Sequence, residues 1–425
     1  MELVELNRDE FIEFSKNYPN SLFFQSPYWI DIKKDNGWTG TMIGLKEDNK
    51  IIAGTVLLFK KIKVINKNIV YSPRGFLLDY NDTELLNAFV SRLKSYLKTK
   101  NALFLKINPY VKYQDRTVDG EIVPETRNFK VMKDLKNLGF NHNGFYVTMD
   151  EKKDLEPRWL SVLNLKDIDL DTLFKNMRST TRWSIRNSEK NSLRIIECNK
   201  EDLKEFKLLM QHTAERREFI DRPLSYYENL YDILSKENLV KVLLVEINFK
   251  SLLEKTKIEY KELTDKIERI KDNPLKEKEL KELSSQTESF ERRINDLEEY
   301  NKSYGDTKII AGGLYMLYGK HLVYLLGASY KEFMKYNSQY LLQWEMIKYA
   351  KENGYDTFNF YGIDGDFRKE SKNYGLFDFK RGFNAEVVEL IGEFDLVINK
   401  SLYGLYNFGF KTYKKLKNIK NHIKK

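Results

Sequence analysis

The chain has 425 residues, of which 41% are hydrophobic and 14% aromatic, and its formal net charge is +9. A chain of this length can build two or three domains, and its apolar content excludes an intrinsically disordered protein. The positive charge favours anionic partners, namely nucleic acid, phosphorylated ligands or an anionic membrane face, although many soluble bacterial proteins are equally basic.

The N-terminal residues 1–8 carry neither the basic start nor the apolar core of a signal peptide. Cys198 is the single cysteine, so no intramolecular disulfide can form and a reducing compartment is expected. The longest apolar stretch, 309–330, is interrupted by Gly-Lys-His at 319–321, which predicts a hairpin turn and not a membrane span. We expect a cytoplasmic protein that contacts a membrane at most peripherally.

The first third of the chain predicts an α/β unit. Residues 51–60 (IIAGTVLLFK) and 69–71 are predicted strands. Asp82 begins a predicted helix over 83–99, and a further strand covers 102–108 (ALFLKIN). The order of hairpin, helix and strand indicates a mixed sheet flanked by helices.

A group of basic residues, here called the cationic stripe, follows at spacings of three and four: Lys175, Arg178, Arg182, Arg186 and Lys190. If 172–190 is one helix, these side chains share a face, on which like charges repel. An anionic partner that offsets this repulsion is one interpretation, and a solvated helix face is the other.

Residues 249–303, here called the arm, lose the strand pattern and become rich in Lys and Glu. The residues at heptad spacing, most of them apolar, are Leu252, Thr256, Tyr260, Leu263, Ile267 and Ile270 in a rougher first set, then Leu280, Leu283, Thr287, Phe290, Ile294 and Leu297. Asp272-Asn273-Pro274 between the two sets is a turn signal. The pattern predicts an antiparallel coiled-coil hairpin. Residues 250–303 hold 13 basic and 14 acidic residues, so charge does not mark the arm as a nucleic-acid contact.

A second α/β unit follows the arm and resembles the first. Residues 309–320 (IIAGGLYMLYGK) share the letters IIAG with the first hairpin. A strand at 322–327, a helix over 338–352 ended by Gly354, and a strand at 356–361 (DTFNFY) follow in the same order. The shared order predicts a duplicated domain, whose second copy the arm interrupts.

The C-terminal tail, 411–425, holds seven Lys and no acidic residue. Its apolar residues at helical spacing are Tyr413, Leu416, Ile419 and Ile423. This pattern fits an interfacial helix at an anionic membrane face, and it fits a frayed basic terminus as well.

The usual signs of cofactor or nucleophile chemistry are absent. The histidines have no metal-ligand spacing: His142, His212, His321 and His422. The sequence contains no Ser/His or Cys/His motif, no phosphate-binding G-x-x-x-x-G-K-[ST] loop and no acetyl-CoA loop. No metal and no cofactor are therefore expected. An enzyme of this kind needs a substrate that is already activated, such as an aminoacyl ester on tRNA.

Four segments carry a family resemblance. They are FFQSPYWIDIKKDNGW at 23–38, YSPRGFLLDY at 71–80, ERREFIDRPLSYY at 215–227 and YGIDGDFRKESKNYGLFDFKRGFNAEVVELIGEFDLVIN at 361–399. They resemble the Fem (FemABX) family of peptidoglycan interpeptide-bridge aminoacyltransferases over nearly the whole chain. The sequence looks most like the FemX-type branch, which adds the first bridge residue, and the arm lies where many members carry a helical hairpin.

The resemblance implies two α/β domains related to the GNAT acyltransferase fold, with the precursor bound at their boundary. We expect domain 1 to comprise 1–155 and 385–425, domain 2 to comprise 156–248 and 304–384, and the arm to be inserted in domain 2 as 249–303.

The implied activity is tRNA-dependent aminoacyl transfer of the lipid II:glycine glycyltransferase type. An amino acid would pass from aminoacyl-tRNA to the stem-peptide amino group of lipid II or UDP-MurNAc-pentapeptide, with Gly, Ala and Ser all open as the transferred residue. The cationic stripe is then the expected tRNA contact, and the tail the expected contact with the inner membrane leaflet. Two alternatives remain: a GNAT-like N-acyltransferase that uses acyl-CoA, and a non-enzymatic RNA-associated coiled-coil protein.

The resemblance also implies precursor-binding residues. The matching positions are Lys33 or Lys34, then Arg222 and Tyr226, with Tyr324 as a further contact. Arg222 and Tyr226 lie four residues apart, which is one turn if this stretch is helical. An Arg side chain with a neighbouring Tyr hydroxyl suits a phosphate group.

Lys380 matches the catalytic-site lysine of the family, and Phe379 before it is an expected substrate contact. A fixed cation there would stabilise the negative charge that develops on the ester carbonyl oxygen. The attacking amine must also lose a proton. Asp364 is one candidate base, with Asp366 nearby. Family members often carry an acidic residue at the end of strand 103–108, where this chain has Asn108.

Overall fold

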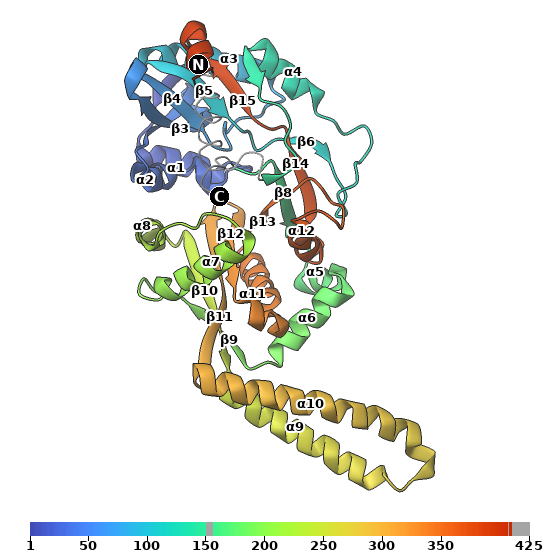
Figure 1. Ribbon diagram of the computed structural model, residues 1–425. Coiled ribbons are helices and arrows are strands. Elements are labelled where there is room, and N and C mark those ends of the chain that lie inside the picture. Colours follow the sequence, from blue (N-terminus) through green and yellow to red (C-terminus); the bar gives the residue numbers. More distant parts are fainter. Residues whose placement is uncertain (150–155, 407, 410–425) are drawn as a thin grey trace.

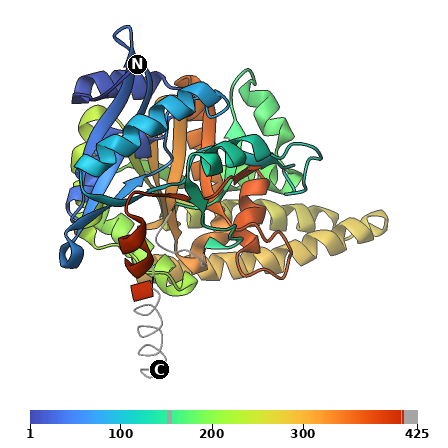
Figure 2. The same cartoon turned by 90° about the horizontal axis from the view of Figure 1, so that it is seen from above.

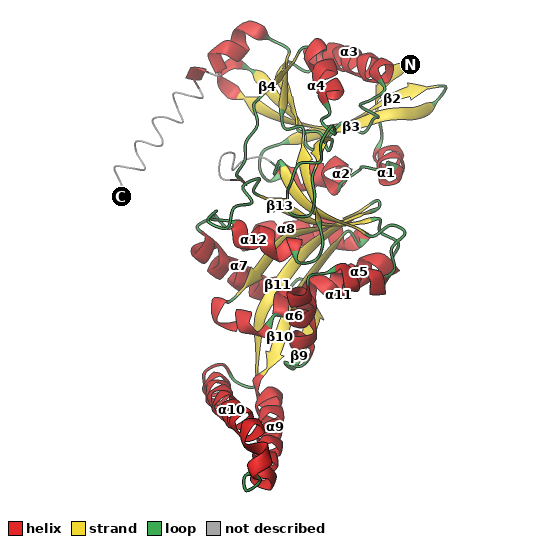
Figure 3. Cartoon of the chain, turned by 90° about the vertical axis from the view of Figure 1, so that its right-hand side faces the viewer, coloured by secondary structure: helices red, strands yellow, loops and turns green. Residues whose placement is uncertain are grey.

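The structure is a computed structural model that describes residues 1–149, 156–406 and 408–409 (Figure 1). Two sheets lie one beyond the other along the length of the molecule, and the arm extends from the second (Figures 1 and 3). The basic tail at 411–425 lies outside the described residues. Within the described ranges, no helix is both long and apolar enough to cross a bilayer.

The first sheet has seven strands in the order β1-β2-β3-β4-β5-β15-β7. Their bounds are Glu2–Glu5, Thr39–Glu47, Lys50–Ile62, Lys67–Ser72, Ala102–Ile107, Phe394–Val397 and Phe140–His142. β4 and β5 are parallel, and the other neighbours are antiparallel. Helices α3 (Thr83–Thr99) and α4 (Phe129–Asn137) bury their apolar faces on this sheet, which makes it the core of the first unit.

The second sheet has eight strands in the order β6-β14-β8-β13-β12-β11-β10-β9. Their bounds are Lys112–Asp115, Glu386–Leu390, Trp159–Asn164, Thr357–Ile363, His321–Ser329, Thr307–Tyr318, Val240–Asn248 and Leu193–Glu197. One face packs against α5 (Leu170–Asn176), α6 (Ser179–Glu189) and α11 (Ser338–Glu352), and the other against α7 (Leu203–Arg217) and α8 (Leu224–Leu234). The predicted fold class, two mixed sheets flanked by helices, is confirmed.

Within the described residues, the chain crosses between the two sheets four times, after β5, β6, β7 and β14. β6 comes from the N-terminal third but pairs with β14, and β14 pairs with β8 in the second sheet. After β14 the chain returns to the first sheet as β15, so this last crossing falls after β14 and not at residue 385, the predicted boundary. A buried ion pair fixes this region, because Glu389 accepts from Arg158 and from Arg116 (2.7 Å).

Several local predictions are confirmed at the level of single residues. The Asp82 carboxylate accepts a hydrogen bond from Leu85 N–H (2.9 Å) and so caps α3. Gly354 follows α11 with φ +71°, a conformation that glycine adopts without strain. The hairpin between β11 and β12 pairs Tyr318 with His321.

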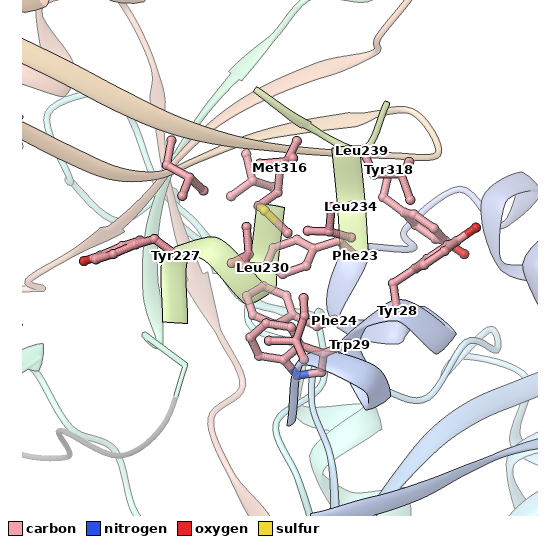
Figure 4. Packing of buried hydrophobic residues seen from close by; sticks show 14 of the residues in the cluster. Phe23, Phe24, Tyr28, Trp29, Tyr227, Leu230, Leu234, Leu239, Met316 and Tyr318 are labelled. Carbon is pink, nitrogen blue, oxygen red and sulfur yellow. The ribbon is translucent and has the colours of Figure 1, made fainter. Parts of the chain in front are cut away.

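One hydrophobic core connects the two sheets. α1 (Arg8–Asn17), the short helix η1 (Phe23–Gln25) and α2 (Pro27–Lys34) lie between them. Trp29 meets Phe23 and Phe24 edge-on at 5.3 and 5.2 Å, and the same cluster contains Leu234 of α8 and Met316 of β11 (Figure 4). Burying one such large apolar side chain contributes roughly 1.5–3 kcal/mol. The relative position of the two units is therefore fixed by packing.

The arm is a helical hairpin of α9 (Phe249–Ile270) and α10 (Glu277–Tyr304), joined by the short helix η5 (Pro274–Lys276). Its facing side chains include buried Leu252, Thr256, Leu263, Leu283 and Leu297, all of them on the predicted heptad positions. Seen from above, it extends to one side of both sheets (Figure 2). At its base, Phe249 and Tyr300 pack on Phe333 of the second unit, at 5.7 and 5.2 Å.

Candidate functional site

The second sheet opens between its two central strands. β12 and β13 are parallel and pair only through His321–Val323 and Thr357–Asn359. Beyond these pairs β12 continues along β11, and β13 continues along β8. In the first sheet the corresponding parallel strands, β4 and β5, stay paired to the end of both. The two units are therefore not equivalent, and only the second offers a gap between parallel strands.

A strained residue marks the edge of this opening. Tyr361 in β13 has φ +67°, and the register with β8 shifts between Asn359 and Tyr361. The Asn359 side chain supports the bulge by accepting from Tyr361 N–H (2.8 Å). Positive φ at a bulky residue costs about 1–3 kcal/mol and persists where the surroundings enforce it. The bulge directs the phenol of Tyr361 and the carbonyl of Gly362 toward two different ionisable groups.

The first of these groups is Lys380 on α12 (Tyr374–Arg381). Its side chain is buried, and its Nζ donates to the Gly362 carbonyl (2.6 Å). Among the described residues, no carboxylate lies within ion-pair distance of this nitrogen. Burial lowers the pKa of Lys380 to about 7. Negative charge developing beside it would favour the ammonium form, so Lys380 is suited to respond to an oxyanion.

Phe379 and Tyr324 lie on the α11 face of the second sheet. Phe379 meets Tyr340 of α11 edge-on (5.0 Å). Tyr324 stacks on Tyr315 (5.2 Å) and donates to Gln339 Oε1 (3.1 Å). Tyr324 thus belongs to β12, on the opposite side of the strand opening from the Gly362 carbonyl, and the structure does not bring it together with the other predicted precursor contacts.

Both carboxylate oxygens of Asp364, the predicted base, accept hydrogen bonds from other loop segments. One carboxylate oxygen accepts from Met149 N–H and the other from the Asn373 side-chain amide, both at 2.8 Å. Asp366 is bound through both oxygens by Arg368, which lowers the pKa of Asp366 to about 2. Because the Asp364 oxygens hold two loop segments together, the geometry argues against the proton-accepting role that the sequence analysis gave it.

The other predicted precursor contacts meet where α2 packs against α8. Lys33 lies over the Trp29 ring at 4.2 Å, whereas Lys34 points to solvent and pairs with Asp31 (2.7 Å). Burial lowers the pKa of Lys33, and the nearby Arg222 guanidinium adds to that shift. Arg222 in turn lies 5.7 Å from the Tyr226 ring centroid. Lys33, Arg222 and Tyr226 therefore lie close together, and Lys34 is not part of this group.

Glu156 is the second ionisable side chain that the bulge at Tyr361 contacts, after Lys380, and the sequence alone did not identify it. The Tyr361 hydroxyl donates to the Glu156 carboxylate. Glu156 also acts electrostatically on Lys33, where it opposes the lowering of the pKa, and on Tyr226, whose pKa burial raises. It lies just before β8, in a stretch without a motif. The sequence offers one indirect signal, the neutral Asn108 at a position where the family resemblance implies an acidic residue.

The cationic stripe is not on one continuous helix. α5 ends at Asn176, and α6 begins at Ser179, because Met177 and Arg178 are extended with ψ of 150° and 144°. The condition under which the five side chains share a face, one helix over 172–190, is therefore not met. The break is stabilised by the side chain of Arg182, which donates to the carbonyl groups of Lys175 (2.7 Å) and Met177 at the end of α5.

The five stripe residues consequently do different things. Arg178 is committed to Asp378 on α12, with both oxygens at 3.1 Å. Arg182 completes the end of α5. The stripe residues that remain solvent-exposed are Lys175, Arg186 and Lys190. Trp183 on α6 is 62% exposed beside them.

Comparison with known proteins identifies relatives over the whole chain. The family model of the FemAB family matches residues 6–411. The chain is 32% identical to aminoacyltransferase FemA of Staphylococcus aureus strain MRSA252, covering all of both, and 31% identical to FemA of Staphylococcus epidermidis, covering 98% of this chain and all of the relative. A crystal structure of FemX superposes with a TM-score of 0.76 at 31% identity, covering 95% of this chain and 99% of that one. The identities to FemA and FemX are nearly equal and do not choose a branch.

Proposed function

The chain belongs to the FemAB family, and on that premise we propose that it transfers an amino acid from aminoacyl-tRNA to the stem-peptide amino group of a peptidoglycan precursor. Aminoacyl transfer in the synthesis of the peptidoglycan bridge is the activity of the family. The observation that supports the proposal most strongly is the buried Lys380 at the strand opening, with no carboxylate partner among the described residues.

In this reaction the acceptor amine attacks the ester carbonyl of the aminoacyl-tRNA. Negative charge then builds on the carbonyl oxygen, and the ammonium group of Lys380 stabilises it. When the C–O bond breaks, the ribose hydroxyl leaves and takes up a proton. The interaction is strong because Lys380 is buried, where the effective dielectric constant is low.

The site formed by Lys33, Arg222 and Tyr226 binds the diphosphate that lipid II and UDP-MurNAc-pentapeptide have in common. Two cations and a phenol, Lys33 on α2, Arg222 in the loop before α8 and Tyr226 on α8, match a diphosphate in charge and in hydrogen-bonding capacity. The site lies on the α8 side of the second sheet, and Lys380 hydrogen-bonds at the strand opening. The peptide therefore extends from the diphosphate toward Lys380.

The tRNA approaches from the side of α5 and α6. The exposed stripe residues provide phosphate contacts there: Lys175, Arg186 and Lys190. Arg178 joins this surface to the catalytic helix, because it pairs with Asp378 two residues before Lys380. The acylated 3′ end can thus reach the opening between β12 and β13 from the α11 face.

We assign the reaction to the cytoplasm, where charged tRNA is available, with the tail at 411–425 as a peripheral contact to anionic lipid. Deletion of the tail should reduce sedimentation with anionic vesicles and slow the reaction on lipid-linked acceptor. Equal vesicle binding by the shortened protein would remove this role.

The decisive experiment presents the purified protein with each charged tRNA in turn and with both precursors, and detects the mass added to the stem peptide. Transfer from one charged tRNA identifies the amino acid, and comparison of the precursors identifies the acceptor. Labelled acetyl-CoA tests the acyl-CoA alternative. Transfer from the thioester and none from any charged tRNA would overturn the proposal.

A further inference from the structure

The proposed reaction lacks a group that accepts the proton of the acceptor amine. A lysine-type amine has a pKa of about 10.4 and is almost entirely protonated at neutral pH, whereas only the neutral amine can attack. Asn108 stands where an acidic residue would serve, and the Asp364 oxygens are engaged by loop amides. Lys380 is itself a cation or a hydrogen-bond donor at the site.

The structure places the Glu156 carboxylate at the strand opening, on the side of the proposed precursor site. Glu156 contacts Tyr361 of β13, and its charge acts on Lys33 of α2 and Tyr226 of α8. Burial raises the pKa of Tyr71, a residue of β4 in the first sheet that donates to Asn108 (3.2 Å), and the charge of Glu156 adds to this shift. Elements of both units therefore surround this carboxylate at the predicted precursor site.

Glu156 and Lys380 are held by consecutive residues of one strand. Tyr361 binds Glu156 through its phenol, and Gly362 binds Lys380 through its carbonyl. The positive φ of Tyr361 creates this arrangement, since a regular strand would present these groups differently. Backbone strain at a residue such as Tyr361, whose phenol and following carbonyl contact two ionisable side chains, is typical of a functional site.

We propose that Glu156 receives the acceptor amine of the stem peptide and takes its proton, which completes the catalytic machinery. The proposal rests on the proposed function, because it needs an amine acceptor. The ammonium group gives one proton to the Glu156 carboxylate, and the neutral amine forms the C–N bond to the ester carbonyl. The C–O bond to the ribose breaks, and the ribose oxygen takes the second amine proton. Glu156 then returns its proton to water.

Other charged and titratable groups surround Glu156, and the experiment must distinguish their effects from a proton-accepting role. Lys33, Tyr71, Tyr146, Tyr226 and Tyr361 interact electrostatically with Glu156, and the charges of Arg74, Arg222 and Glu393 act on some of the same side chains. Arg74 is buried and donates to the carbonyl of Pro157 (2.7 Å), the residue after Glu156. The competing role for Glu156 is that of a counter-ion to these cations, which would affect precursor binding and not the proton step.

The test compares wild type, Glu156→Gln and Glu156→Asp with charged tRNA and precursor between pH 6.5 and pH 9.5. A general base contributes typically about 10²–10⁴ in rate, so kcat of the Gln variant should fall by that factor near pH 7 while the KM for precursor changes little. The rate of the Gln variant relative to wild type should then rise with pH, because solvent must deprotonate an amine of pKa about 10.4, whereas the titration of Lys380 affects both proteins alike. The Asp variant should retain part of the activity.

A second measurement keeps the test independent of folding. Precursor with a less basic acceptor amine should narrow the rate ratio between wild type and Glu156→Gln, because less of the amine needs a base. A constant ratio across acceptors, or parallel pH profiles of the two proteins, would overturn the role of Glu156. A wild-type protein inactive with every charged tRNA would instead overturn the proposed function.

Discussion

Replacement of Lys380 by Met should make the protein less active and more stable at once. Methionine keeps an unbranched side chain of similar length but has no charge. Loss of one oxyanion partner typically costs about 10²–10³ in rate, and turnover with charged tRNA and precursor should fall by that factor. Precursor affinity should stay the same, because Lys33 and Arg222 are untouched.

The stability effect follows from the pKa of Lys380, which burial lowers from 10.5 to about 7. Between these values the unfolded chain binds the proton and the native protein does not, so the free energy of unfolding rises with pH in this window. Below pH 7 the native protein carries the full cost of a buried ammonium group. A shift of this size corresponds to a stability cost on the order of 5 kcal/mol.

The Met variant lacks this dependence. It should exceed wild type in stability at pH 6 to 7, and the difference should shrink as the pH approaches 10.5. Urea unfolding of both proteins from pH 6 to pH 10 measures this, and Lys369→Met on the exposed loop before α12 is the matched control. The same pH dependence in Met variant and wild type, or wild-type turnover in the variant, would refute the reasoning.

Three further results are expected. Arg222→Ala should weaken precursor binding by roughly 1.5–3 kcal/mol through loss of charge-assisted hydrogen bonds, and unchanged affinity in calorimetry would contradict this role. Reversal of Arg186 and Lys190 to Glu should flatten the plot of log K for tRNA against log salt by about one to two units, whereas replacing the arm with a short Gly-Ser turn should leave the slope nearly unchanged. The opposite pattern would move the tRNA site to the arm. Glu389→Ala should lower the free energy of unfolding by about 3–5 kcal/mol in urea unfolding, because it leaves the buried Arg158 without its carboxylate partner. A loss of stability below about 1 kcal/mol would show that the pair is dispensable.

Local sequence chemistry determined the elements of this protein. The Asp82 cap, the Gly354 stop, the turn at 319–321 and the heptad spacing of the arm each act within a few residues. Such signals do not depend on where the rest of the chain lies, and the elements that they predict appear at the predicted places. The duplicated order of hairpin, helix and strand likewise predicted two mixed sheets before any contact was known.

Only the tertiary structure decided which residues meet. β6 and β14 join the second sheet through partners far away in sequence, and no local pattern encodes that choice. The stripe residues lie on two helices and not on one. The side chain of Arg182 stabilises the break by donating to a carbonyl group at the end of α5, a contact that residue spacing does not reveal.

The site shows the same division. The resemblance supplied the identity of Lys380, but its burial, its lowered pKa and its bond to Gly362 follow from packing around it. Glu156 carries no motif and becomes a candidate base only because the bulge at Tyr361 turns a phenol toward it. Side-chain spacing fixes helices and strands through short-range hydrogen bonds and burial, whereas an ionisable group acquires its chemistry from neighbours that only the folded chain brings within reach.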